Sequence, residues 1–153
     1  MRTKREDADD RDLFKKWRGK WSGFVTVMKP SIRKDKNGSY EERNGDGYRL
    51  RRSDMEKLDL FSGDDGIYEW RIRETREVVY VGKSESSSDC SVLDRVDQYC
   101  TDGSHLATKI DKVLEEGQAL QVRVLLKIYT GEDAGEMEKE VLKKYKYPWN
   151  RRS

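Results

Sequence analysis

One acidic residue near the end of the chain occupies a position where an isolated charge is costly. Residues 133–145 have helical periodicity, and at about 100° per residue their apolar side chains share one face, namely Ala134, Met137, Val141, Leu142 and Tyr145. Glu138 falls near the middle of this face, whereas Glu136 and Glu140 fall on the far side. An inward carboxylate needs a cationic partner or a metal ion. Two interpretations therefore stand for Glu138, a buried salt bridge, for example with Arg95, or a ligand of Mg²⁺, which unlike zinc suits one carboxylate with several waters.

Two tyrosines could lie on one side of a predicted hairpin. Residues 67–73 alternate between two faces, with Tyr68 on the less polar one, which indicates a half-buried strand. Residues 78–81 are β-branched or aromatic throughout, which indicates a second strand, buried on both faces, that carries Tyr80. Gly82 ends this strand where another backbone or a ligand could approach closely. As core residues, the two tyrosines need only a hydrogen-bond partner for each hydroxyl.

Arg95 and Tyr99 lie one turn apart on a helix predicted after the hairpin. The apolar residues of this helix recur at helical spacing, namely Val92, Leu93, Val96 and Cys100. Arg95 falls at the edge of that buried face. From its position alone, the simplest interpretation is a surface salt bridge with Asp94 or Asp97.

The remaining elements complete an α+β pattern. Residues 120–128 alternate cleanly and predict a third strand. Before it, a second helix ends at Gly117, and its inner side carries Leu106, Ile110, Val113 and Leu114. From residue 66 the predicted order is therefore strand, strand, helix, helix, strand, helix.

The composition predicts one domain with a modest core. The chain has 153 residues, of which 41% are charged and 34% apolar, and its net charge is only +2. Basic residues are in excess over residues 29–52 and again over 143–152. Two basic patches on a near-neutral chain fit a phosphate-binding face, although solvated surface explains them nearly as well.

The sequence has no apolar run long enough to span a membrane and no secretory signal. We therefore expect an intracellular protein without a membrane partner, in the nucleus if its source is a eukaryote. Cys90 and Cys100 form no CxxC pair, and His105 is the only histidine. A structural zinc site needs four such ligands, so none is expected.

Two tripeptides carry a family resemblance. Gly66-Ile67-Tyr68 followed by Tyr80-Val81-Gly82 resembles the paired signature of the GIY-YIG nucleases. The resemblance implies a small three-stranded antiparallel sheet flanked by helices in residues 61–153. Residues 1–60 would then form a basic, aromatic-containing extension packed on this domain.

The resemblance also implies roles for the tyrosines and the basic residues. Tyr68 would activate the attacking water, assisted by Tyr80 and Lys83. A tyrosine with its ordinary pKa near ~10 needs a cation beside it to act as a base, and Lys83 is the candidate. Arg95 and Tyr99 would bind the scissile phosphate.

Glu138 matches the metal-binding glutamate of this family, and Asn150 matches a late asparagine that orients the site. Glu138 would hold Mg²⁺ or Mn²⁺ at the leaving 3′ oxygen. The partner implied is DNA, and the residues expected to contact it are Arg49, Arg51, Arg52, Lys83 and Arg95.

The resulting hypothesis is a divalent-metal-dependent endonuclease that nicks DNA as a monomer. The alternative is a catalytically inactive GIY-YIG-fold module that binds DNA and regulates transcription. A looser likeness to the plant Effector of Transcription proteins bears on this alternative, although their Cys-rich zinc repeats are absent. That likeness rests on four short stretches, residues 47–49, 66–69, 103–106 and 147–150.

Overall fold

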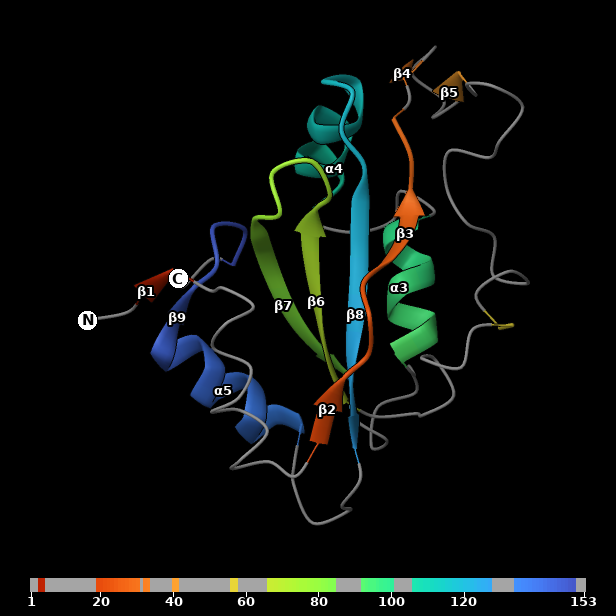
Figure 1. Ribbon diagram of the computed structural model, residues 1–153. Coiled ribbons are helices and arrows are strands. Elements are labelled where there is room, and N and C mark those ends of the chain that lie inside the picture. The colour runs from red at the N-terminus through yellow and green to blue at the C-terminus, as the bar shows by residue number, and fades with distance from the viewer. Residues whose placement is uncertain are drawn as a thin grey trace.

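The centre of the molecule is an antiparallel sheet in which β7, β6 and β8 lie side by side (Figure 1). β6 spans Gly66–Ile72, β7 spans Val78–Ser84 and β8 spans Leu120–Lys127. The predicted three-stranded antiparallel sheet is therefore confirmed. The computed structural model describes residues 3–4, 19–30, 32–33, 40–41, 56–57, 66–84, 92–100, 106–127 and 134–150.

Two strands from residues 1–60 widen this sheet. β2, Gly19–Trp21, and β3, Val25–Met28, both pair antiparallel with β8. β2 pairs with residues 125–127 of β8 and β3 with residues 120–122. The N-terminal segment therefore joins the sheet through main-chain hydrogen bonds, a closer attachment than the packing we expected.

Short pairs of strands lie outside the main sheet. β1, Thr3–Lys4, pairs in parallel with β9, Tyr145–Lys146, so a piece of the N-terminal end lies against the C-terminal part. β4, Ile32–Arg33, pairs antiparallel with β5, Tyr40–Glu41. In Figure 1 the β1–β9 pair lies next to the end of α5, Ala134–Lys144.

The order of elements from β6 onward is the predicted one. α3, Val92–Cys100, and α4, Ala107–Glu115, follow the hairpin, and α5 follows β8. α4 ends as expected before Gly117, which has a φ of 88° that favours glycine. α3 and α4 pack on one face of the sheet and α5 packs on the other, beside the edge strand β7 (Figure 1).

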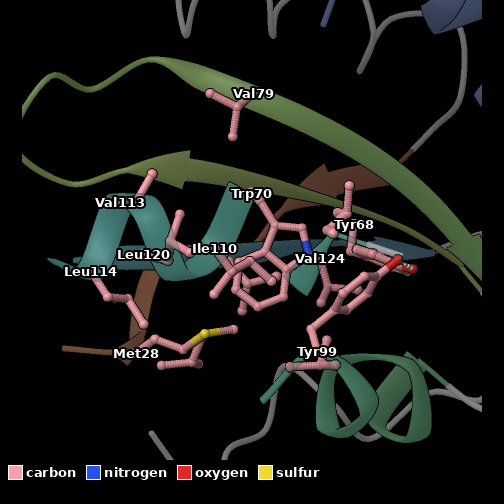
Figure 2. Packing of buried hydrophobic residues seen from close by; sticks show 14 residues of the cluster. Met28, Tyr68, Trp70, Val79, Tyr99, Ile110, Val113, Leu114, Leu120 and Val124 are labelled. Carbon is pink, nitrogen blue, oxygen red and sulfur yellow. Dashed lines mark hydrogen bonds between the residues drawn. The ribbon is translucent and has the colours of Figure 1, made fainter. Parts of the chain in front are cut away.

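The main core lies between the sheet and the helices α3 and α4. Trp70 of β6 is 1% exposed and lies at its centre, where its ring meets Tyr99 of α3 edge-on at 5.5 Å between centroids (Figure 2). Alternation along β6 places Tyr68 on the same face. Burying such an aromatic ring contributes on the order of 2–3 kcal/mol. Around it pack Met28, Val79, Ile110, Leu114, Leu120 and Val124.

The opposite face of the sheet holds a buried ion pair that corrects one expectation. The alternation of β6 predicted an outward, polar position for Glu69, whose side chain is fully buried. Arg123, its register partner on β8, donates to Glu69 from Nε at 3.0 Å and from a terminal nitrogen at 2.6 Å. The Tyr147 hydroxyl donates to the second carboxylate oxygen. α5 and β9 cover this face, so the carboxylate needs all three donors.

Candidate active site

Three tyrosine hydroxyls meet where β6, β7 and α3 come together. The hydroxyls of Tyr68 and Tyr99 share a hydrogen bond of 3.1 Å, and Tyr99 donates to Tyr80 at 3.4 Å. Their rings pack edge-to-face, with centroids 6.1 Å apart for Tyr68–Tyr99 and 6.0 Å for Tyr80–Tyr99. Tyr68 and Tyr80 therefore do point to one side of the hairpin. Tyr99 lies between them and touches both (Figure 2 shows its contact with Tyr68).

A glycine makes room for the first of these rings. Gly82 of β7 is the register partner of Tyr68 on β6, and the Tyr68 ring lies over it. A Cβ at position 82 would stand 2.5 Å from both Cζ and the hydroxyl oxygen of Tyr68. Such contacts do not occur between real atoms, so only glycine fits without moving the ring. A group does approach Gly82 closely, as expected, but it is a tyrosine side chain and not a backbone or a ligand. The strand also continues past Gly82, where we expected it to end, to Ser84.

Burial is the main cause that raises the pKa of all three tyrosines above the ordinary value of 10.0. The Arg95 guanidinium opposes this rise at each of them, because a positive charge favours the phenolate. The Glu138 carboxylate adds to the pKa rise of Tyr68 and Tyr80. The charges of Arg95 and Glu138 therefore act on the same hydroxyls, from α3 and from α5.

Arg95 brings an unused donor to this cluster. Its side chain is half-buried on α3, one turn before Tyr99. Its Nε atom is buried, and within the described part of the chain it has no hydrogen-bond partner. A buried donor without an acceptor is costly. An anion such as a phosphate would supply the acceptor and offset this cost.

Glu138 is half-buried on α5, beside the buried Val141. Its carboxylate is near enough to Tyr68 and Tyr80 to raise the pKa of both, and the inward orientation expected from the helical wheel stays a prediction. Among the residues with described placement, no three His, Cys, Asp or Glu side chains gather in one place. One carboxylate completed by waters and substrate oxygens is a donor set that suits Mg²⁺. The residues present therefore fit a magnesium ion better than a metal with a full protein cage.

Asn150 fastens the C-terminal part of the chain to the edge strand. Its Nδ2 donates to the carbonyl of Val81 at 2.9 Å, and its Oδ1 accepts from the Val81 amide at 3.0 Å. The Trp149 amide donates to the carbonyl of Val79 at 2.8 Å. These three bonds flank Tyr80, so residues 149 and 150 hold the backbone of β7 on both sides of that tyrosine.

Of the basic residues predicted to bind DNA, Lys83 lies apart from the hydroxyl cluster and three arginines cannot be placed. Lys83 is exposed, and its register partner is Ile67, so it lies on the face of the sheet away from the hydroxyl cluster. The cation that lowers the tyrosine pKa values is Arg95, and a similar effect of Lys83 stays a prediction. Arg49, Arg51 and Arg52 lie outside the described residues.

Sequence reasoning missed the group formed by Glu69, Arg123 and Tyr147. A signal was available, since a Glu and an Arg at the centres of two predicted strands can pair across a sheet. The guanidinium groups of Arg71 and Arg123 also lie over the Phe24 ring, at 3.9 Å and 4.6 Å from its centroid. These contacts tie the N-terminal segment to β6 and β8.

The comparisons with known proteins agree with this geometry. A family model described as GIY-YIG domain-containing protein matches residues 41–153. The match covers most of the chain, so the protein belongs to the GIY-YIG domain family, and the resemblance seen in its signatures is confirmed. No curated protein and no solved structure matches the chain.

Membership indicates nuclease-type activity in general and DNA as the substrate. The match begins at residue 41, inside the segment 1–60 that we expected to be an extension, and the boundary at residue 60 stays a prediction. None of the helices that the structure describes is long and apolar enough to cross a membrane.

Proposed function

We propose that this protein is a divalent-metal-dependent endonuclease that hydrolyses DNA phosphodiester bonds and nicks one strand per chain. The observation that carries the proposal is the convergence of unlike groups from four elements, β6, β7, α3 and α5. The charges of Arg95 and Glu138 both act on the hydroxyls of Tyr68 and Tyr80. A packed core alone does not need opposite charges beside buried hydroxyls, whereas phosphoryl chemistry needs a cation, an acceptor for a proton and a carboxylate for metal.

Arg95 is the residue that binds the scissile phosphate. Its buried Nε has no partner in the described part of the chain, and the adjacent terminal nitrogens of a guanidinium donate in the same plane. Together they fit two oxygens of one phosphate. Because negative charge grows on these oxygens during attack, the same bonds strengthen in the transition state and lower the barrier.

Tyr68 holds the attacking water and, after losing its own hydroxyl proton to solvent, accepts the proton of that water as a phenolate. Burial keeps its hydroxyl neutral in the free protein, since even a tyrosine with a pKa of 10 is only about 1% ionised at pH 8. The hydrogen bond shared with Tyr99 and the charge of Arg95 both lower the pKa of Tyr68 and so favour its phenolate. Tyr99 is therefore assigned to orienting Tyr68 and Tyr80, with which it is already hydrogen-bonded, in addition to the phosphate contact predicted from sequence.

Glu138 is the residue that would hold the metal ion. It is the acid of α5 whose charge reaches the hydroxyl cluster. Bound there, Mg²⁺ or Mn²⁺ would act as a Lewis acid on the phosphodiester and its leaving oxygen. Until a cation binds, Glu138 opposes ionisation of Tyr68, so a positive ion at this carboxylate would also remove that opposition.

The proposal is tested with supercoiled plasmid incubated with the full chain in Mg²⁺ and, in parallel, in EDTA. We expect conversion to nicked circles in Mg²⁺ and no conversion in EDTA. Nicking that continues in EDTA would overturn the metal dependence. Plasmid that is bound but never cut in Mg²⁺ or Mn²⁺ would overturn the nuclease assignment in favour of the inactive DNA-binding module.

A further inference from the structure

Trp149 holds a tryptophan ring beside the edge strand β7. Its amide donates to the carbonyl of Val79, the residue before Tyr80, at 2.8 Å. The next residue, Asn150, binds both the amide and the carbonyl of Val81, the residue after Tyr80. Trp149 is half-buried, and its side chain packs against the main core between the sheet and the helices α3 and α4. The indole ring therefore lies on the same side of the sheet as the three tyrosine hydroxyls.

The surroundings of this ring differ from those of the other half-buried aromatic side chains. Two guanidinium groups lie over the ring of Phe24, and the ring of Tyr80 meets another tyrosine of the cluster edge-on. Among the described side chains, no second ring and no cation lies against the indole of Trp149. Part of a large aromatic side chain is therefore left open to solvent.

Packing alone does not need an indole at this place. Trp70 shows the ordinary structural use of a tryptophan, because it is 1% exposed and lies at the centre of the main core. Aliphatic side chains fill other half-buried positions at the margin of this core, namely Val25, Ile72 and Leu93. An aliphatic side chain in place of Trp149 would leave less apolar surface in water. What an indole adds is a rigid π-face on which a nucleobase can stack.

The hydrogen bonds of residues 149 and 150 fix the indole relative to the candidate active site. They hold the backbone of β7 on both sides of Tyr80, whose hydroxyl accepts a hydrogen bond from Tyr99. Arg95, the proposed phosphate-binding residue, lies one turn before Tyr99 on α3. A strand whose phosphate lies on Arg95 can therefore bring a nearby base to the indole. Because core packing already orders the ring, little conformational freedom is lost when a base stacks on it.

Stacking on a side chain requires a base with a free face. In a duplex both faces of a base are covered by its neighbours, and taking the base out of the stack is costly. The bases of single-stranded DNA have open faces, and aromatic side chains bind them with little dependence on sequence. An aromatic platform beside a cleavage site therefore favours a substrate that is unpaired at that site.

We propose that Trp149 stacks on an unpaired base close to the scissile phosphate, so that the preferred substrate is DNA that is single-stranded or bulged at the cut. The proposal rests on the proposed function for the phosphate at Arg95. The identity of the stacked base should matter little. Negative supercoiling promotes local opening of duplex DNA, so the plasmid of the nicking assay also offers such bases.

The test uses Trp149→Leu, which fills space without a π-face, and Trp149→Phe, which keeps a smaller π-face. Ile72→Ala is the matched control, because Ile72 is also half-buried against the main core but lies at the hairpin end of β6. Binding is measured in EDTA, so that no strand is cut, to an oligothymidylate of about 12 nucleotides. The second probe is an oligonucleotide of the same length made of abasic units, which has the same phosphates and no bases.

We expect the parent to bind the oligothymidylate about 5- to 100-fold more tightly than the abasic probe. Trp149→Leu should lose most of this preference, whereas Trp149→Phe and Ile72→Ala should keep most of it. Affinity for the abasic probe should be the same in all four proteins. The oligothymidylate should also quench tryptophan fluorescence in the parent and quench it much less in a bound Trp149→Phe protein.

A Trp149→Leu protein that is folded by urea unfolding and keeps the preference for bases would overturn the proposal. Equal quenching in the parent and in bound Trp149→Phe would do the same, and this comparison does not depend on the folding of Trp149→Leu. An equal loss of affinity for the oligothymidylate paired with its complement would overturn the preference for unpaired DNA. If Trp149→Leu loses the preference for bases while the parent never nicks plasmid in Mg²⁺, the stacking site stands and the nuclease assignment fails.

Discussion

Gly82→Ala tests the packing that places the first tyrosine. The new Cβ would stand 2.5 Å from Cζ and from the hydroxyl oxygen of Tyr68 and 2.7 Å from Cε2. Tyr68 is 1% exposed, so its ring is enclosed by other core side chains and cannot move without displacing them. Ordinary contacts between heavy atoms lie near ~3.5 Å, so the ring must shift by about 1 Å and carry its hydroxyl away from Tyr99.

The cost has two parts. Overpacking in a core destabilises by typically about 1–3 kcal/mol, and the hydrogen bond between Tyr68 and Tyr99 contributes about 0.5–1.5 kcal/mol. Replacing a glycine stiffens the unfolded chain and returns about 0.4–1 kcal/mol. We therefore expect Gly82→Ala to lower the free energy of unfolding by about 1–3 kcal/mol. Nicking should fall at least tenfold, because the displaced hydroxyl no longer meets the phosphate site.

Urea unfolding and plasmid nicking measure these two effects. Gly23→Ala is the matched control, since nothing lies within 4 Å of a Cβ at Gly23, and it should be neutral or slightly stabilising. Tyr68→Leu removes the far end of the ring, so the double variant with Gly82→Ala should be less destabilised than the sum of the single variants by about 1 kcal/mol. Strict additivity, or parent stability in Gly82→Ala, would refute the close approach.

Three further predictions follow from the described contacts. Asn150→Ala removes both bonds to Val81 and should lower the free energy of unfolding, measured in urea, by about 1–3 kcal/mol. Nicking should fall by more than the loss of folded protein explains, because the backbone beside Tyr80 loses its support, and a fall only in proportion to unfolding would contradict this. Arg123→Met leaves the buried Glu69 carboxylate without its cation and should lower the free energy of unfolding by about 3–5 kcal/mol. The double variant Glu69→Met/Arg123→Met should lose less stability than this single variant. The opposite order would show that the two charges are not buried together. The pKa values of the three tyrosines are raised on folding, so as pH rises the unfolded chain loses these protons first, near its pKa of ~10. Stability should therefore fall steeply from about pH 10 upward. Tyr68→Phe should weaken this fall in a series of thermal unfolding curves at increasing pH.

Periodicity was enough to predict the elements that carry the candidate site. The alternation around Tyr68 and the helical spacing around Arg95 are local patterns, and local patterns report the faces of strands and helices. The inward position predicted for Glu138 followed from the same reasoning. Because each residue lies on a regular element, the sequence could indicate that these groups face the core before their partners were known.

Non-local partners could not be predicted in this way. The bonds from Asn150 to Val81 join residues 69 positions apart, and periodicity has no information on such pairings. Glu69 was expected to face solvent because alternation of polar and apolar residues is typical of a strand with one solvated face, and a buried ion pair with Arg123 produces the same pattern. The addition of β2 and β3 to β8 is a third case, since any free sheet edge can accept a strand.

Glu138 carries the central claim, and one measurement tests it most directly. Glu138→Gln keeps the shape of the side chain and removes the charge that would hold Mg²⁺, and Glu115→Gln on the exposed side of α4 is its control. Both variants and the parent are given supercoiled plasmid in Mg²⁺, and their folding and DNA binding are measured alongside. We expect nicking by the parent and by Glu115→Gln, and none by a folded, DNA-binding Glu138→Gln protein. Nicking by Glu138→Gln at the parent rate would contradict the assignment of the site.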